Sequence, residues 1–242
     1  ALKDIPSDIF KNKILVSAVK GVIPDDNLIV SDFITKYYNV DPLNIGVIGG
    51  PCHSEEVALE RLSFLTFGFK NIEYARQFAD FFRCRHINTR ISDDVDGIEY
   101  AAILKNIFAI ASGMSSALGY GDNFQAVLIA NAIQEMKNFI DKVSPAVRDI
   151  NQPVYLGDLL VTAYSQFSRN RTFGHMIGKG YSVKSAQLEM NMIAEGYFAV
   201  KCINMINSQL NVNMAITSTV YNIIYNGVSP KVGFKNLSAE LN

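Results

Sequence analysis

One lysine lies in apolar company near the middle of the chain. Lys105 interrupts the stretch EYAAILKNIFAIASGM, and on a helix its neighbours three and four positions away are Ala101, Ala102, Phe108 and Ala109. Burial lowers the pKa of an ammonium group, and alanines leave room for a ligand, so this lysine could transfer a proton in a reaction. A lysine whose stem reaches water at a domain edge fits the same pattern. The residue types alone leave both interpretations open.

Two further polar positions are candidates for ligand binding. Asp158 stands among apolar residues in YLGDLLVTAYS, although on its own it is better explained as a helix N-cap. Ser168, Arg169 and Asn170 belong to the sequence SRNR at an expected helix start. Backbone N–H groups and a guanidinium at such a start could hold a phosphate, and a solvated basic turn is the equally weighted alternative.

In the stretch NIGVIGGPCHSEE, residues 44–56, an apolar run ends in paired glycines before a possible helix start, which is typical of a nucleotide-binding turn. A dinucleotide fingerprint needs G-x-G-x-x-G between a strand and a helix, and neither this stretch nor any other in the sequence has that spacing. A P-loop motif is absent too. The spacing therefore favours a strand end at which glycines let the chain turn, with a helix beginning near Ser54.

Other chemically active side chains carry weaker signals. Lys20 follows an expected strand, where ligands of open α/β sheets gather, and an exposed turn lysine is the alternative. His53, His86 and His175 show no metal-ligand spacing, and we expect structural roles for His86 and His175. The aspartates within residues 93–96 are better explained as helix caps than as cation ligands.

The elements that must position these side chains change in type along the chain. Residues 1–92 alternate strand-like and helix-like runs, which predicts a parallel α/β sheet that resembles the second half of a doubly wound domain. Expected strands lie at 14–19, 45–48 and 63–67, and expected helices at 27–38 and 72–82. Residues 93–242 predict an all-helical domain with helices at 98–114, 122–143, 156–166, 171–178, 183–190, 195–209 and 214–225.

Composition narrows the class of protein. The 242 residues are 49% hydrophobic and 19% charged, with a net charge of −1, which gives no global reason to expect a nucleic acid or an anionic membrane as partner. Three widely separated cysteines favour a reducing compartment. No apolar run reaches the roughly 18 residues that span a bilayer, so we expect a cytoplasmic protein without membrane insertion.

Several motifs, taken in order, resemble one enzyme family. They are VSAVKG, GVIGGPCHSEEVA, AILKNIFAIASGM, LGYGDN, LGDLLVTAYSQFSRNRTFG and AEGY. Together they are similar to the NAD(P)-dependent glycerol-3-phosphate dehydrogenase family. The resemblance implies NAD or NADP as cofactor and interconversion of dihydroxyacetone phosphate and sn-glycerol 3-phosphate, which supplies phospholipid synthesis. It also implies a homodimer, and a Rossmann domain followed by a helical domain like the C-terminal domain of 6-phosphogluconate dehydrogenase.

The resemblance also implies roles for individual residues. Lys105 matches the general acid/base, and Asp158 matches a substrate-binding carboxylate that orients it. The implied substrate-binding residues are Lys20, Gly50, Cys52, Lys105, Asp158, Ser168, Arg169 and Asn170. The implied cofactor-binding residues are Lys20, Ser54, Arg169, Ile193 and Glu195.

Two departures from the family pattern qualify these implications. The family commonly has Ser-Phe-Ala where this sequence has Cys52, His53 and Ser54, and a thiol is a weaker hydrogen-bond partner than a hydroxyl. The family's glycine-rich βαβ start, which takes at least about 30 residues, has no counterpart before the first expected strand. We therefore expect a truncated dehydrogenase that turns over poorly by itself. The alternatives are another reductase, or a catalytically inactive module of this fold for phosphometabolite binding or oligomerisation.

Overall fold

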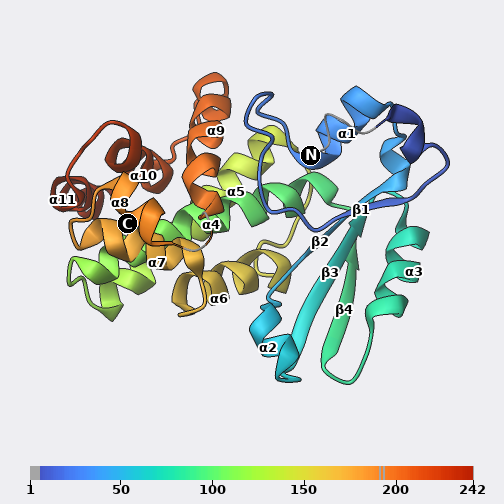
Figure 1. Cartoon of the computed structure of the whole chain (residues 1–242), viewed down its shortest axis with the longest axis horizontal. Helices are drawn as coiled ribbons and strands as arrows, with labels where there is room; N and C mark the ends of the chain where they lie inside the picture. Colours follow the sequence, from blue (N-terminus) through green and yellow to red (C-terminus); the bar gives the residue numbers. More distant parts are fainter. Residues whose placement is uncertain (1–5, 191, 193, 242) are drawn as a thin grey trace.

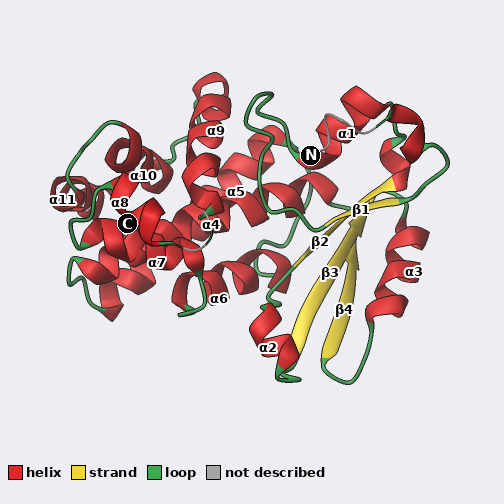
Figure 2. Cartoon of the chain, viewed as in Figure 1, coloured by secondary structure: helices red, strands yellow, loops and turns green. Residues whose placement is uncertain are grey.

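The strands of the molecule lie at one end and most of its helices at the other (Figures 1 and 2). A computed structural model describes residues 6–190, 192 and 194–241. Its sheet contains β1 (Leu15–Ser17), β2 (Ile45–Gly49), β3 (Ser63–Phe69) and β4 (Ile87–Ser92). The accompanying helices are α1 (Val30–Tyr38), α2 (Ser54–Ala58) and α3 (Ile72–Phe82). The α/β part predicted for the start of the chain is thus confirmed, and the predicted helix at 72–82 coincides with α3.

The sheet is mixed rather than parallel as predicted. Its strands lie in the order β1-β2-β3-β4, and β1–β2 and β3–β4 are parallel pairs. β2 and β3 run antiparallel, with Gly46 opposite Phe69. Only five residues of the β2–β3 connection are helical, and Glu60, at φ 53°, then turns the chain back in the left-handed conformation. A parallel crossover usually needs a longer helix, so this connection returns the chain beside β2 in the opposite direction.

The second part of the chain is helical, as predicted. Its helices are α4 (Val95–Ala117), α5 (Asp122–Val143), α6 (Asp158–Tyr164), α7 (Arg169–Gly178), α8 (Val183–Glu189), α9 (Glu195–Leu210), α10 (Ala215–Tyr225) and α11 (Pro230–Glu240). α4 is buried on nearly all of its faces, because it packs against α5, α6, α7 and α9. Within the described residues, every helix is too short or too polar to span a membrane.

α4 and α7 approach each other closely because glycines face each other at the contact. A Cβ atom built at Gly113 of α4 would lie 2.0 Å from the carbonyl oxygen of Arg171, and one at Gly174 of α7 would lie 2.0 Å from that of Ile110. No side chain fits at these distances, so the two backbones can touch only where both residues are glycine. The contact fixes the start of α7 beside the middle of α4.

A polar cluster holds the segment before α6 against the start of α4. Asp94 caps α4 by accepting from the backbone N–H of Gly97 at 3.1 Å, which confirms the predicted capping role. The same carboxylate accepts from Arg148 at 2.8 and 3.0 Å and from the Tyr155 hydroxyl. Burial opposes its charge, but the hydrogen bonds from Arg148 and Tyr155 hold the pKa of Asp94 below its ordinary value.

This cluster has a direct consequence for the next helix. Tyr155 belongs to a π-helical turn, Pro153–Gly157, that runs straight into Asp158, the first residue of α6. The bonds of Asp94 therefore locate Asp158 relative to α4.

Replacing Arg148 with methionine should destabilise the protein by about 3 kcal/mol, because it leaves a largely buried carboxylate without its partner. The side chains of Arg148 and Asp94 are only 2% and 12% exposed. Urea unfolding measures the loss. The control is Arg76→Met, which breaks an ion pair whose side chains are 59% and 63% exposed and should cost less than about 1 kcal/mol. Equal losses in the two variants would contradict the prediction.

Candidate active site

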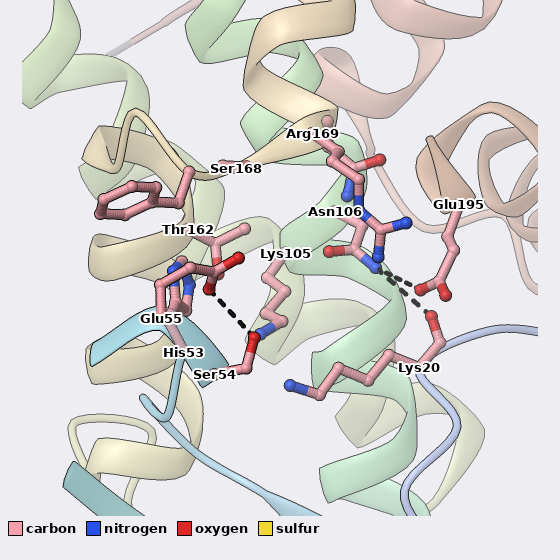
Figure 3. A pocket seen from close by; sticks show the side chains of 12 residues that line it. Lys20, His53, Ser54, Glu55, Lys105, Asn106, Thr162, Ser168, Arg169 and Glu195 are labelled. Carbon is pink, nitrogen blue, oxygen red and sulfur yellow. Dashed lines mark hydrogen bonds between the residues drawn. The ribbon is translucent and has the colours of Figure 1, made fainter. Parts of the chain in front are cut away.

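A polar pocket of about 210 Å³ lies where α4, α6 and the starts of α7 and α9 meet the N-terminal part of the chain. Figure 3 shows the side chains that line it. The volume is below the roughly 300–1,000 Å³ of pockets for drug-sized ligands, so it suits a small polar molecule. Among the described residues, His, Cys, Asp and Glu side chains form no group of three that could hold a metal ion.

A buried ion pair forms the base of the pocket. The Lys105 ammonium on α4 donates to Oδ1 of Asp158, and the two side chains are 4% and 2% exposed. Burial lowers the pKa of Lys105 to about 8, although the carboxylate opposes that shift. Lys105 therefore does not reach out to water, so the interpretation as a lysine at a domain edge is wrong. It lines the pocket as an ammonium that can lose its proton near neutral pH.

The second oxygen of this carboxylate is available for a further bond. Thr162, one turn along α6, donates to the backbone carbonyl of Asp158 at 2.6 Å and lies 3.5 Å from Oδ1. Oδ2 of Asp158 is buried and has no hydrogen-bond partner among the described residues. No side-chain capping bond is formed at the start of α6, so Asp158 is an ion-pair partner rather than the N-cap that its sequence context favoured.

The N-terminus of α7 faces the pocket with residues of the SRNR sequence. Ser168 caps the helix by accepting from the backbone N–H of Arg171 at 3.3 Å, and it is buried. Asn170 is buried too, and its Oδ1 accepts from the backbone N–H of Gly196 at 2.9 Å. Arg169 is exposed and lines the pocket. Two buried side chains exclude a fully solvated turn, and a helix N-terminus with a guanidinium is a suitable place for an anion.

On the open side of the pocket, Asn106 of α4 connects two other segments of the chain. Its amide nitrogen lies 3.3 Å from the carbonyl oxygen of Lys20 and 3.5 Å from a carboxylate oxygen of Glu195, as Figure 3 shows. The loop after β1 and the start of α9 are thereby held beside α4. Asn106 was not among the predicted site residues. It could have been found, because it is a polar side chain in the same apolar stretch as Lys105.

The turn at residues 50–56 contributes the wall opposite α7. Gly50 has φ +117°, and a Cβ atom there would lie 2.6 Å from the carbonyl oxygen of Phe64, so the strand end needs glycine at this position. His53, Ser54 and Glu55 line the pocket, and the Ser54 hydroxyl donates to Glu55 at 3.1 Å. This confirms the prediction that the glycines end a strand and that a helix begins at Ser54.

The structure brings together most, but not all, of the predicted site residues. Those that line the pocket are Lys20, Ser54, Lys105, Ser168, Arg169, Asn170 and Glu195. Asp158 lies directly behind Lys105, whereas Gly50 and Cys52 are not among the lining residues. Cys52 is half-buried, and burial raises the pKa of its thiol. Ile193 lies outside the described residues. The lining residues that sequence reasoning missed are His53, Glu55, Asn106, Thr162 and Phe167.

Known protein families match both parts of the chain. Residues 1–75 match the N-terminus of NAD-dependent glycerol-3-phosphate dehydrogenase, and residues 94–235 match its C-terminus. The glycerol-3-phosphate dehydrogenase [NAD(P)+] of Bacillus velezensis is 32% identical over 96% of this chain and 67% of its own length. That of Chlorobium phaeobacteroides is 34% identical over 88% of this chain and 64% of its own.

A solved structure agrees with these matches. The glycerol-3-phosphate dehydrogenase of Coxiella burnetii superposes with a TM-score of 0.87 at 25% identity, over 92% of this chain and 67% of that protein. The chain thus spans about two thirds of the length of the relatives it matches.

Replacing both members of the ion pair together should leave the stability unchanged, whereas replacing either member alone should lower it. Lys105→Met or Asp158→Leu alone leaves a buried charge unpaired and should cost about 3 kcal/mol of unfolding free energy. The double variant buries two apolar side chains instead and should be as stable as the wild type within about 1 kcal/mol. Urea unfolding of the four proteins measures this cycle. A double variant as unstable as the single ones would contradict the prediction and make the pair a structural requirement.

Proposed function

Because the chain belongs to the NAD-dependent glycerol-3-phosphate dehydrogenase family, we propose that it interconverts dihydroxyacetone phosphate and sn-glycerol 3-phosphate. The observation that carries this proposal is the buried Lys105–Asp158 pair beside a helix N-terminus, which puts a proton donor and an anion site in one small pocket. Reaction of a three-carbon phosphate needs the anion site for its phosphate group and the proton donor for its C2 oxygen. The chain spans about two thirds of its relatives, so the activity of the whole protein is part of the proposal.

The phosphate group of the substrate would bind at the start of α7. Ser168, Arg169 and Asn170 lie there, and Lys20 adds a second cation from the other side of the pocket. Backbone N–H groups at a helix start and a guanidinium are strong partners for a phosphate dianion. Binding at this end leaves the carbon chain to extend toward Lys105.

Proton transfer at C2 would be the task of Lys105. During reduction, negative charge develops on the C2 oxygen, and the ammonium gives it a proton; during oxidation, the neutral amine removes that proton. Asp158 keeps the amine oriented through its Oδ1, and its unpartnered Oδ2 can accept a hydrogen bond from a substrate hydroxyl. A bound nicotinamide dinucleotide would supply or accept the hydride.

The polar groups on the open side of the pocket fit such a cofactor. Lys20 and Arg169 offer cations for phosphates or donors for ring substituents, and Glu195 offers an acceptor for a carboxamide. Ser54 lies on the same rim, and Ile193 stays a prediction from the resemblance.

The proposal also includes two further substrate contacts, a domain boundary, an oligomeric state and a location. Gly50 and Cys52 would contact substrate from the turn after β2. The boundary between the cofactor domain and the helical substrate domain would fall between residues 92 and 93. A homodimer, a cytoplasmic location and a role in phospholipid synthesis follow from the family resemblance.

Ligand binding tests the phosphate site directly. Millimolar sn-glycerol 3-phosphate should raise the melting temperature of the chain, because a ligand that binds only the folded state stabilises it. Arg169→Ala should remove most of this shift, since it deletes the guanidinium. Arg171→Ala on the same helix turn is the matched control, because Arg171 does not line the pocket. No shift, or a shift that survives Arg169→Ala, would contradict the proposal.

The ionisation of Lys105 should appear in its titration. Its amine should titrate near pH 8, as the lowered pKa requires, whereas exposed lysines titrate above about 10. NMR of lysine side chains, with Lys105→Met for assignment, measures this. Oxidation of sn-glycerol 3-phosphate needs the neutral amine, so its rate should rise with pH to a plateau above about pH 8, and the reduction rate should fall over the same range.

In the whole protein, Lys105→Met should lower both rates by at least about 100-fold, followed by the absorbance of NADH or NADPH. Near-normal turnover in this variant would remove Lys105 from the mechanism. Binding of sn-glycerol 3-phosphate by the whole protein without any turnover would favour the phosphometabolite-binding module.

A further inference from the structure

His53 is a titratable side chain of the pocket that the proposed mechanism does not use. It is the N-cap residue of α2, and its carbonyl accepts from the backbone N–H groups of Glu56 and Val57 at 3.1 and 3.0 Å. The helix thereby fixes the backbone of His53 at the end of the turn after β2. The side chain is half-buried and lines the same pocket as Lys20 and Lys105 (Figure 3).

Charged groups from four elements act on the imidazole. Lys105 on α4 and Lys20 after β1 oppose a positive charge on the ring, and Asp158 on α6 and Glu55 on α2 favour one. Burial is the largest influence, followed by Lys105, and together they hold the pKa of His53 below its ordinary value. In the free protein at neutral pH the ring is therefore neutral and polar.

A phosphorylated ligand would reverse this balance. The proposed ligand brings a phosphate dianion into a pocket of about 210 Å³, so no lining side chain is far from it. The dianion would offset the repulsion from Lys20 and Lys105 and favour a proton on the ring. A side chain at this position that cannot ionise, such as phenylalanine or glutamine, could not respond in this way.

We propose that His53 is a substrate-binding residue that takes up a proton when the phosphorylated substrate enters the pocket. The inference rests on the proposed function, because it needs sn-glycerol 3-phosphate or dihydroxyacetone phosphate at the site. The protonated ring donates a hydrogen bond to the ligand and adds a cation to those of Lys20 and Arg169. His53 thus makes substrate affinity depend on pH, separately from the proton that Lys105 transfers.

The direction of this dependence follows from linkage. A group whose pKa is higher in the complex than in the free protein strengthens binding fully below the free pKa, and the gain is lost as the pH rises through the pKa of the complex. The free pKa of His53 lies below 6.5. Its contribution to affinity is therefore larger in acidic solution and is lost as the pH rises through the pKa of the complex.

The test compares the binding of sn-glycerol 3-phosphate to the wild type, His53→Phe and His53→Gln at pH 5.5 and pH 8 by calorimetry. The ionisation of the free ligand is the same in every titration, so it cancels in the ratio of dissociation constants. The ratio of variant to wild type should be several-fold larger at pH 5.5 than at pH 8, because only the wild type gains the proton on His53. His53→Gln keeps a polar side chain and should lose the same pH-dependent gain.

Histidine NMR gives a second readout that a structural role would not change. The sequence has three histidines, so His53→Gln and His175→Gln assign the ring signals. The pKa of His53 should rise on saturation with sn-glycerol 3-phosphate, and that of His175, which does not line the pocket, should stay constant. His175→Gln is also the matched control for affinity, with a ratio that does not change with pH.

The outcomes separate this inference from the proposed function. Ligand binding that depends on Arg169 but shows the same pH dependence in the wild type and in His53→Phe would overturn the role of His53 alone. The absence of binding to the wild type at both pH values would overturn the two together. An unchanged His53 pKa in the saturated protein would also overturn the inference.

Discussion

The arrangement of this molecule depends on a lysine and an aspartate that are buried together. An ion pair with side chains 4% and 2% exposed loses nearly all of its hydration, and such pairs rarely repay that loss in stability. The surroundings must therefore hold both charges in place. α4 supplies the lysine from its most buried stretch, and the bonds of Asp94 to Arg148 and Tyr155 fix the segment that leads into Asp158. Much of the helical part thus holds one buried ammonium and its carboxylate partner in place.

Close packing extends this constraint to the anion site. Facing glycines bring the backbones of α4 and α7 into contact, with Gly113 against Arg171 and Gly174 against Ile110. The spacing of these two helices, which carry Lys105 and the SRNR sequence, is then set by main-chain contact, which does not vary with rotamers. Asn106 similarly ties Lys20 and Glu195 to α4 through a single amide group. Three separate segments thus take their positions from one helix.

Sequence patterns predicted local features well and non-local ones poorly. The helix at 72–82 and the turn at Gly50 followed from periodicity and glycine placement, whereas the apolar neighbours of Lys105 left its burial open. The direction of β3 could not be read, because strand pairing joins residues far apart in sequence. β4 was missed since its exposed edge position gives it few apolar residues. α11 carried a Ser-Pro start that could have been recognised.

The candidate site was predictable from the sequence only in part, for the same reason. Residue types marked Lys105, Asp158 and the SRNR sequence one by one, but not which of their open interpretations holds. That choice depends on tertiary contacts, such as the ion pair that makes Asp158 more than a helix cap. Asn106 and Thr162 were missed because each is a single polar residue beside a stronger candidate.

The unequal burial of the pocket walls has a consequence for how such a site can evolve. Almost every residue of α4 is part of the core, so a substitution there changes folding and catalysis together. α2 is five residues long and buries none of them. Substitutions in α2 should therefore change the stability of the fold little. New ligand preferences would arise first in this wall of the pocket. Cys52 and His53 lie directly before this short helix.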